Sequence, residues 1–527
     1  MRKHTFLHFF AFVAIALVAC SNLFAQENNC CPEDKCCKEA IVKDIDSYIQ
    51  KVKDEWQLTG LAASFALDGD VIYSKAFGVK EKGGNEPIDV NTVFQIGSVS
   101  KSFTATVMAS LVAEGKVKWE DTVANILPDF RMYDPWVTKN MQVKDIMTHR
   151  SGLRGQAGTY IPNVGYDRDD VYKMLGLLKP VYSFRGDYQY NNITFIIAEK
   201  IIEKVTGKSW EENVRERVFG PVGMTLSSMN GEDFKVQKNV AVPHEYFYRD
   251  SINVNALHGD DQALWWLTVV GPAGSVNSTV TDMIKYAEFH RTNGKVDGKQ
   301  VMDPKAVAYL HKGHNITSQT GNKTTLYGNC WFIEQNNRYR LYFHTGTTWG
   351  FTALCFFVPE IELSGVILVN CEAGASPRYA IMRRLIDLVM GAPAGQFTEE
   401  FKDYSKESFE EWLADEKRSQ AKAEEAAAKE EKIEAPKSKL LVGEYVKDEL
   451  FGNARVSLEG DQLYIEIGKK GFRNKLNHKN GNTFTFWSDG HEFPLNFFMD
   501  EKGKRVTGFE VEFNYNEEES FGGWTKK

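Results

Sequence analysis

The sequence predicts an α/β protein of the α+β type, in which helices flank an antiparallel sheet and a small all-β domain follows toward the C-terminus. Three observations predict this architecture. Residues 40–395 have strand patterns near both ends and helical patterns between them. Residues 396–439 are rich in Glu, Lys and Ala, and residues 440–527 alternate between apolar and polar side chains. A chain of 527 residues is long enough for two such cores.

Both ends of residues 40–395 supply strands to the predicted sheet. Leu61–Leu67 turns at Asp68-Gly69 into Val71–Tyr73, which is the signal of a β-hairpin. The other end has three strand patterns and then a helical pattern: Tyr339–Phe343, Phe351–Val358, Gly365–Val369 and Arg378–Met390. Strands from both ends can therefore pair in one antiparallel sheet on which helices pack.

Helical periodicity covers most residues between these two groups of strands and also precedes the first strand, at Ile41–Val52. The clearest helices of the middle region are Ser102–Glu114 and Ile193–Val205. Gly207 follows the second helix where a left-handed C-cap is favoured. The sequence thus predicts a helical subdomain, and we expect the functional cleft where this subdomain meets the sheet.

The segments after this domain have simpler patterns. Residues 396–439 contain few large apolar side chains, which predicts a charged, solvated helical linker. Residues 440–527 predict a small antiparallel barrel or sandwich. Its strands are expected at Leu441–Val446, Ala454–Leu458, Leu463–Ile467, Thr483–Trp487, Asn496–Met499 and Val506–Phe513.

Residues 1–25 are typical of an export signal. Met1–His4 is positively charged, and the apolar run behind it is short for a transmembrane helix. Leu17-Val-Ala-Cys20 fits a lipoprotein box in which Cys20 is lipidated, whereas Leu23-Phe-Ala25 suits ordinary signal peptidase. Both endings predict export, either to the periplasm or as an envelope lipoprotein tethered to the membrane through Cys20.

Residues 26–39 form a Cys-rich leader. In an exported protein its four cysteines predict disulfides or a tether: Cys30, Cys31, Cys36 and Cys37. A metal site is the alternative, but no histidine lies nearby and an oxidising compartment disfavours free thiolates. Three further cysteines stand in apolar surroundings and are expected to be buried small side chains: Cys330, Cys355 and Cys371.

The charge balance excludes one class of partner. The formal net charge is -8 and the pI is near 5.9, so the chain lacks the basic surface that nucleic-acid binding requires. Beyond the N-terminal run, no apolar stretch is long enough to cross a bilayer. The expected partner is instead a small molecule.

A Ser-x-x-Lys element, Ser98-Val-Ser-Lys101, stands at the start of the helix predicted at residues 102–114. A second such element, Ser419-Gln-Ala-Lys422, lies in the charged linker, where no buried helix start is expected. Positions i and i+3 share a helix face, so the Lys101 amine can reach the Ser98 hydroxyl. A desolvated lysine can accept the serine proton, and a helix N-terminus offers N–H groups to an oxyanion.

Two more polar elements follow in the chain. Tyr190-Asn-Asn192 stands directly before the helix predicted from Ile193, which displays a phenol and a carboxamide at a helix entry. A strand pattern ends in His344, Thr345, Gly346, Thr347, Thr348, Trp349 and Gly350. Glycine in such a segment lets a substrate approach the strand edge. The three elements in this order predict a nucleophilic serine site.

With these motifs the chain resembles the serine β-lactamase-like and penicillin-binding-protein-like hydrolases, particularly the class C β-lactamase, esterase and D-aminopeptidase branches. Supporting segments are Phe94–Phe103, Thr148–Leu153 and Pro272–Thr279 with Asp282. The resemblance implies a β-lactamase/transpeptidase-like fold over residues 40–395. The small C-terminal domain resembles lipocalin-like domains attached to such hydrolases.

The resemblance also implies roles for individual residues. Ser98 would be acylated, while Lys101 and Tyr190 would share general-base and general-acid work. Asn192 would orient the substrate and the lysine. The backbone N–H groups of Ser98 and Thr347 would form the oxyanion hole, beside the substrate-binding residues His344, Thr345, Gly346 and Trp349.

One departure from the family pattern concerns the third motif. Penicillin-processing members commonly have Lys-Thr-Gly, whereas this chain has His344, which is largely neutral at pH 7. Efficient β-lactamase activity is therefore not expected, and ester or amide substrates are favoured. Trp349 is the favoured candidate for lining an apolar groove, and Trp265-Trp266 are weaker candidates. His149 is expected to be structural.

The sequence thus predicts an exported enzyme that hydrolyses ester or amide acyl substrates, which are small molecules or peptides, apolar ones included. No cofactor and no metal is expected. One alternative is an acyltransferase that passes the acyl group to a hydroxyl or amine, and a second is a non-catalytic envelope binding protein. The oligomeric state does not follow from the sequence.

Overall fold

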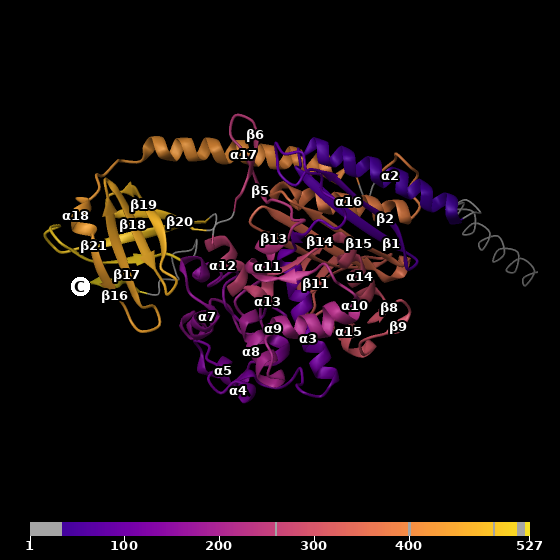
Figure 1. Ribbon diagram of the computed structural model, residues 1–527, viewed down its shortest axis with the longest axis horizontal. Coiled ribbons are helices and arrows are strands. Elements are labelled where there is room, and N and C mark those ends of the chain that lie inside the picture. The colour runs from indigo at the N-terminus through magenta and orange to yellow at the C-terminus, as the bar shows by residue number, and fades with distance from the viewer. Residues whose placement is uncertain (1–33, 259–260, 399–401, 489–490, 514–521) are drawn as a thin grey trace, which may run out of the picture.

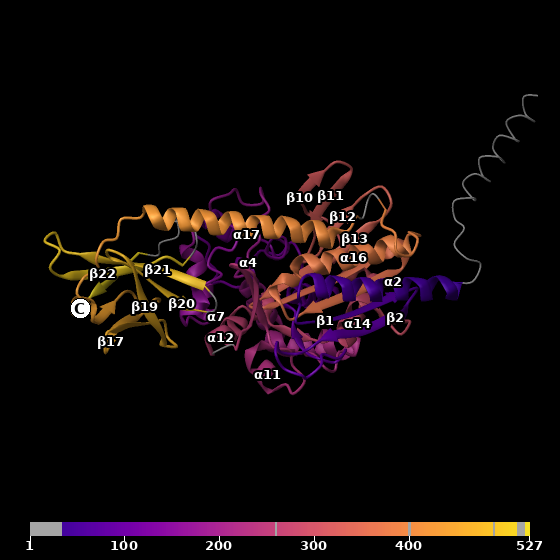
Figure 2. The ribbon, with the colours of Figure 1, turned by 90° about the horizontal axis from the view of Figure 1, so that it is seen from above.

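The computed structural model describes residues 34–258, 261–398, 402–488, 491–513 and 522–527. They form a large mixed domain and a small barrel, and one long helix runs across the top between them (Figures 1 and 2). The predicted α+β architecture with an all-β C-terminal domain is confirmed. The predicted export signal and Cys20, Cys30 and Cys31 lie outside the described residues.

The large domain is built on an eight-stranded antiparallel sheet of order β10-β11-β12-β13-β14-β15-β1-β2. Strands from the two chain ends meet where Leu61 of β1 pairs with Val369 of β15, as predicted. The bounds are β1 Gly60–Leu67, β2 Asp70–Gly78, β10 Asn315–Thr320, β11 Lys323–Tyr327, β12 Phe332–Gln335, β13 Arg340–Thr348, β14 Phe351–Val358 and β15 Leu363–Val369.

The three strands β10, β11 and β12 were not predicted from the sequence. They lie at one end of the sheet, and the residues of β10 are mostly exposed, so their sequence lacks the alternation of a half-buried strand. By contrast β1, β14 and β15 are buried along their whole length. Such strands need cover on both faces of the sheet.

Helices cover both faces (Figure 1). On one face lie α2 (Asp34–Glu55) and α16 (Ala375–Val389), which pack against each other and bury an apolar cluster that includes Ile45, Ile49 and Leu385. On the other face α14 (Val280–Arg291) contacts β1, β14 and β15. The helical subdomain lies beyond this second face.

The helical subdomain is arranged around α3 (Ser100–Ala113), in which every residue from Ser100 to Leu111 is buried. Next to it lies α8 (Phe195–Thr206), which ends at Gly207 in the predicted left-handed conformation, with φ 70°. Further helices are α4 Val123–Ile126, α5 Pro135–Asn140, α6 Val143–Ile146, α7 Arg168–Met174, α9 Trp210–Val214, α10 Gly220–Val222, α11 Asn230–Val236, α12 Asp261–Val269, α13 Gly271–Gly274 and α15 Pro304–Leu310.

Short strands complete the large domain. A three-stranded sheet of order β3-β7-β4 stands beside the start of α3, and β5 with β6 forms a hairpin. Their bounds are β3 Phe94–Gln95, β4 Ser228–Met229, β5 His244–Tyr248, β6 Ile252–Ala256, β7 Val276–Ser278, β8 Lys295–Val296 and β9 Lys299–Gln300. Through β3 and β7 the segments that precede Ser98 and follow α13 are paired.

The charged linker contains α17 (Tyr404–Lys429), the long helix that bridges the two domains (Figure 2). It was predicted to be solvated throughout, and its first half is not. The Trp56 indole N–H donates to Ser405 Oγ at 2.9 Å, and Phe409 and Trp412 pack on the same indole. Phe409 and Trp412 stand among charged residues in the sequence, so the sequence pattern did not indicate that this part of the helix packs on the large domain.

The C-terminal domain is a closed barrel of eight antiparallel strands. Of the two predicted alternatives, a barrel or a sandwich, the structure has the barrel. Buried aromatic rings fill its interior, including Tyr445, Phe486, Phe497 and Trp524. The bounds are β16 Gly443–Val446, β17 Asn453–Glu459, β18 Gln462–Ile467, β19 Phe472–Asn480, β20 Thr483–Ser488, β21 His491–Met499, β22 Val506–Val511 and β23 Trp524–Lys526, after the short α18 Ser438–Leu441.

The barrel prediction missed β19 and β23 and began the first strand at Leu441, which instead ends a helical turn. The only apolar residues of β19 are Phe472 and Leu476, and the buried position between them is Asn474, so the sequence shows no clear alternation of apolar and polar residues there. Cys330, Cys355 and Cys371 are buried free thiols, as expected. None of the helices in the described ranges is long and apolar enough to span a membrane.

We predict that Trp56→Ala loosens α17 from the large domain and lowers the free energy of unfolding by about 3–5 kcal/mol, since a buried indole is lost. Only 2% of the Trp56 surface is exposed. Trp136→Ala, at a residue that is 60% exposed, is the matched control and should change stability by less than about 0.5 kcal/mol. Denaturant unfolding measures both, and equal effects would contradict the docking of α17.

Candidate active site

Ser98 lies in a single 3₁₀ turn, Gly97–Val99, that leads directly into α3. The predicted position at the start of a buried helix is therefore observed. Gly97 has a φ of 50°, and a Cβ there would come within 2.7 Å of the Thr347 backbone nitrogen. Glycine is required at this position because β13 passes so close.

The Lys101 side chain is completely buried and its amine lies 3.0 Å from Ser98 Oγ. The amine also donates to Asn192 Oδ1 at 2.6 Å and to the Ala273 carbonyl at 3.0 Å. Burial lowers the pKa of Lys101 to about 7. A neutral amine has two N–H groups for Asn192 and Ala273, and its lone pair then faces the Ser98 hydroxyl.

Tyr190 completes this group. Its hydroxyl is hydrogen-bonded to Ser98, and the centre of its ring lies 4.6 Å from the Lys101 amine. Burial raises the pKa of Tyr190 well above its usual range, so the side chain is a neutral phenol near pH 7. The His149 ring lies against it with a centroid distance of 4.3 Å, and Nδ1 accepts from the Asn191 N–H at 3.1 Å. His149 thus supports Tyr190, as a structural residue would.

The Asn192 amide has a fixed orientation. Its Nδ2 donates to Gln156 Oε1 at 2.8 Å, so its Oδ1 is the atom that faces Lys101. Gln156 lines the cleft and has a φ of 63°. Gln156 was not predicted from the sequence, because an isolated glutamine between two glycine-containing turns belongs to no periodic pattern or motif.

The third motif lies at the end of β13 and in the turn after it. Its residues that line the cleft are His344, Thr345, Thr347, Thr348 and Trp349. Gly346 does not face a substrate, contrary to the expectation for glycine in this segment. A Cβ on it would lie 1.8 Å from the Ile96 carbonyl oxygen and 3.0 Å from the Ser98 nitrogen. The glycine instead lets β13 pack closely against the serine turn, and both Ser98 and Thr347 line the same cleft.

Gly350 has the same kind of role. It has a φ of 75° between β13 and β14, and a Cβ there would lie 2.6 Å from the His244 backbone nitrogen. The side of Gly350 that carries no Cβ is therefore occupied by the neighbouring backbone at His244 and not by a substrate. Behind β13, the buried Arg378 donates to the carbonyls of Gly346 at 2.7 Å and Ala353 at 2.9 Å. The sequence did not predict that Arg378 holds these two carbonyl groups, because a single arginine in a predicted helix forms no recognisable pattern.

His344 is buried and neutral. Burial and the nearby Lys101 lower its pKa to about 3. Its Nδ1 lies 2.7 Å from the Thr345 carbonyl, so Nδ1 is the donor and Nε2 accepts from the Tyr327 hydroxyl at 3.1 Å. The imidazole therefore presents no positive charge to the cleft at neutral pH.

The cleft has a volume of about 1010 Å³ and is bounded by residues of both domains. Trp266 lines it and is held by its N–H, which donates to the Thr159 carbonyl at 2.8 Å. Trp265 instead donates to the Tyr166 carbonyl and does not line the cleft. From the barrel, Trp487 and Ser488 at the end of β20 also line the cleft. No sequence pattern pointed to these two barrel residues.

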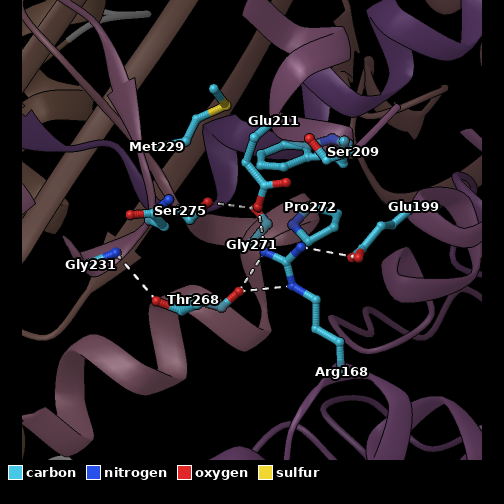
Figure 3. A network of polar contacts seen from close by, with 12 residues as sticks. Arg168, Glu199, Ser209, Glu211, Met229, Gly231, Thr268, Gly271, Pro272 and Ser275 are labelled. Carbon is cyan, nitrogen blue, oxygen red and sulfur yellow. Dashed lines mark hydrogen bonds and ion pairs between the residues drawn. The ribbon is translucent and has the colours of Figure 1, made fainter. Parts of the chain in front are cut away.

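A largely buried ion triad holds the segment that carries the Ala273 carbonyl (Figure 3). Arg168 pairs with Glu199 at 3.0 Å and with Glu211 at 2.8 Å, and its Nε donates to the Thr268 carbonyl. A Cβ at Gly271 would lie 2.2 Å from the Arg168 guanidinium, so α13 packs directly on it. Burial raises the pKa of Glu199 to about 7 despite the opposing charge.

Fold and site define a protein of the serine β-lactamase-like class. The chain belongs to the Beta-lactamase family, whose model matches residues 45–388. The predicted resemblance is confirmed. Curated relatives include penicillin-binding protein 4 of Amycolatopsis lactamdurans, which is 25% identical over 64% of this chain and 88% of its own length. A D-aminopeptidase of Brucella anthropi is 24% identical over 67% of this chain and 63% of its own length.

Solved structures share the fold. The octameric penicillin-binding protein homologue from Pyrococcus abyssi has a TM-score of 0.59 at 20% identity and covers 90% of this chain and 98% of its own. EstCE1, described as a hydrolase with promiscuous acyltransferase activity, has a TM-score of 0.57 at 17% identity, over 67% of this chain and 99% of its own. The first likeness extends over most of this chain, well beyond the family match.

We predict that Gly346→Ala slows the reaction of Ser98 with a fluorophosphonate probe by at least about 100-fold, because the added Cβ displaces one of the two N–H donors. Gly176→Ala is the control, since a Cβ there makes only ordinary contacts of 3.4 Å and longer. Labelling kinetics measure both variants. Wild-type labelling of Gly346→Ala would show that the contact of β13 with the serine turn is dispensable.

Proposed function

We propose that this protein is an exported serine acyl hydrolase that forms a covalent acyl-enzyme at Ser98 on ester or amide substrates. The observation that carries the proposal is the buried Lys101 amine, 3.0 Å from Ser98 Oγ and with a pKa lowered to about 7. A lysine in this state accepts a proton near neutral pH, which an exposed lysine does not do. Export rests on the pattern of residues 1–25 alone.

Acylation then proceeds in two moves. Ser98 Oγ attacks the carbonyl carbon while its proton passes to Lys101, and the carbonyl electrons move to the oxygen. The N–H groups of Ser98 and Thr347 stabilise this oxyanion. When the carbonyl re-forms, the bond to the leaving group breaks. The leaving group takes a proton from the Tyr190 phenol, which is in turn reprotonated from Lys101.

Deacylation reverses the proton path. A water molecule attacks the acyl carbon and gives its proton to the Lys101 and Tyr190 pair, and Ser98 leaves as the hydroxyl. Because the pKa of Tyr190 is raised, the phenol acts as a proton relay and Lys101 is the base that stores the proton. Asn192 keeps the amine oriented throughout by accepting one of its hydrogen bonds.

The substrate class follows from the third motif. The neutral His344 offers no cation for the carboxylate of a β-lactam or a peptide terminus. We therefore propose esters and amides as substrates, with slow turnover of β-lactams. The D-aminopeptidase and penicillin-binding protein relatives are compatible with amide substrates.

A second candidate function is acyl transfer to an alcohol or amine acceptor. The indoles of Trp266, Trp349 and Trp487 all line the cleft, and an apolar rim of this kind disfavours water relative to an organic acceptor. EstCE1 has this fold and is described as having acyltransferase activity. The chemistry at Ser98 is the same in both cases, and only the group that attacks the acyl-enzyme differs.

We predict that intact-protein mass spectrometry detects an acyl adduct on the wild type after incubation with activated esters or D-amino amides, and none on Ser98→Ala. Ser419→Ala is the matched control, because Ser419 begins the other Ser-x-x-Lys element in the exposed part of α17 and should leave labelling unchanged. A β-lactam should label slowly.

The products separate the candidates. Free acid identifies a hydrolase, and acylated alcohol formed in the presence of an acceptor identifies a transferase. Absence of any adduct and any product across the panel would overturn the proposal and favour a non-catalytic binding protein.

We predict that kcat/KM for an activated ester falls about tenfold per pH unit below pH 7, because the base must be the neutral Lys101 amine and its pKa is lowered to about 7. Lys101→Arg keeps a permanent charge and should lose activity by about 10²–10⁴-fold at every pH. Lys116→Arg, at an exposed lysine, is the control. A flat profile from pH 5 to 9 would exclude Lys101 as the base.

A further inference from the structure

We propose that an apolar chamber beside the cleft binds the aliphatic part of the substrate's acyl group. The chamber has a volume of about 410 Å³, within the range of about 300–1,000 Å³ that small-molecule pockets occupy. This proposal rests on the proposed acyl-enzyme at Ser98. It adds the substrate class, which is an ester or amide of a medium-length aliphatic acid.

The chamber and the cleft share a wall. Three residues line both: Trp266, Thr348 and Trp349. Thr348, the last residue of β13, and Trp349, in the turn after it, follow Thr347 directly in the chain, and the Thr347 N–H is the proposed oxyanion donor. A substituent on the reacting carbonyl therefore needs to extend past only these two residues to reach the chamber.

Most of the buried residues that line the chamber are apolar. Phe234 of α11, Ala241, and Leu264 and Leu267 of α12 are all buried, and Gln95 and Thr348 are the buried polar residues among them. The helices α11 and α12 pack against each other and lie together beside the sheet (Figure 1). Polar groups such as Lys235 and His258 belong to its exposed rim. A cavity with an apolar floor and a polar rim favours a hydrocarbon chain over a charged group.

The direction of the chain follows from the proton path. The leaving atom must lie beside Tyr190, which protonates it, and Tyr190 lines the cleft but not the chamber. With the carbonyl oxygen between the N–H groups of Ser98 and Thr347, the remaining substituent on the carbon is the acyl chain. This substituent points away from Tyr190 and along β13 toward Trp349.

The test is a series of 4-nitrophenyl esters with one leaving group and acyl chains from acetyl to octanoyl. For wild type we expect kcat/KM to rise roughly fourfold per added methylene until the chamber is full. Leu257→Trp should fill the chamber, since Leu257 lines it from a half-buried position. Turnover of the octanoyl ester should then fall at least tenfold, and that of the acetyl ester should stay within twofold.

Val236→Trp is the matched control, because Val236 lies at the end of α11 with 78% of its surface exposed, outside the chamber. A second measurement does not depend on turnover or on a stable Leu257→Trp variant. Octanoic acid should bind Ser98→Ala in calorimetry, and acetic acid should not.

The outcomes separate the two proposals. If the acetyl ester is not turned over, the proposed function fails, while octanoic acid binding to Ser98→Ala still reports on the chamber. If esters are turned over through Ser98 but kcat/KM does not depend on chain length, or if Leu257→Trp behaves like Val236→Trp, the chamber proposal is overturned. Absence of octanoic acid binding to Ser98→Ala would also count against it.

Discussion

The contact between the buried Lys101 amine and Ser98 is the interaction on which the site depends. A lysine side chain without solvent is unfavourable when charged, and here burial lowers its pKa to about 7. The fold must therefore provide partners that satisfy a neutral amine. Asn192 and the Ala273 carbonyl do so, and they come from two segments that are distant in the sequence.

This constraint extends outward through the subdomain. The Ala273 carbonyl is placed by α13, which packs on the Arg168 guanidinium through Gly271. The Asn192 amide is placed by Gln156. On the sheet side, Gly346 lets β13 approach the serine turn, and the buried Arg378 holds the carbonyl of that glycine. The geometry of the site thus depends on two arginines that do not line the cleft, the buried Arg378 and the partly buried Arg168.

The sequence predicted the parts of the structure that leave a local pattern. The hairpin at Asp68-Gly69, the central strands and the Ser-x-x-Lys element at a helix start follow from turn chemistry, apolar runs and spacing. The strands β10 and β19 were missed because most of their side chains are solvated. Arg378, Gln156 and Trp487 were missed because each acts through residues far away in the chain, and no local pattern records such a contact.

The neutral state of His344 connects the chemistry to the choice of substrate. Burial lowers the pKa of His344 to about 3, and the nearby Lys101 amine adds to this shift. A permanent cation at this position would oppose protonation of Lys101 in the proposed acylation. With histidine, the proposed base stands beside a neutral side chain, and no Lys or Arg among the described residues lines the cleft to bind a carboxylate. In the proposed function, the apolar surfaces of Trp266, Trp349 and the chamber behind them then contribute to substrate recognition.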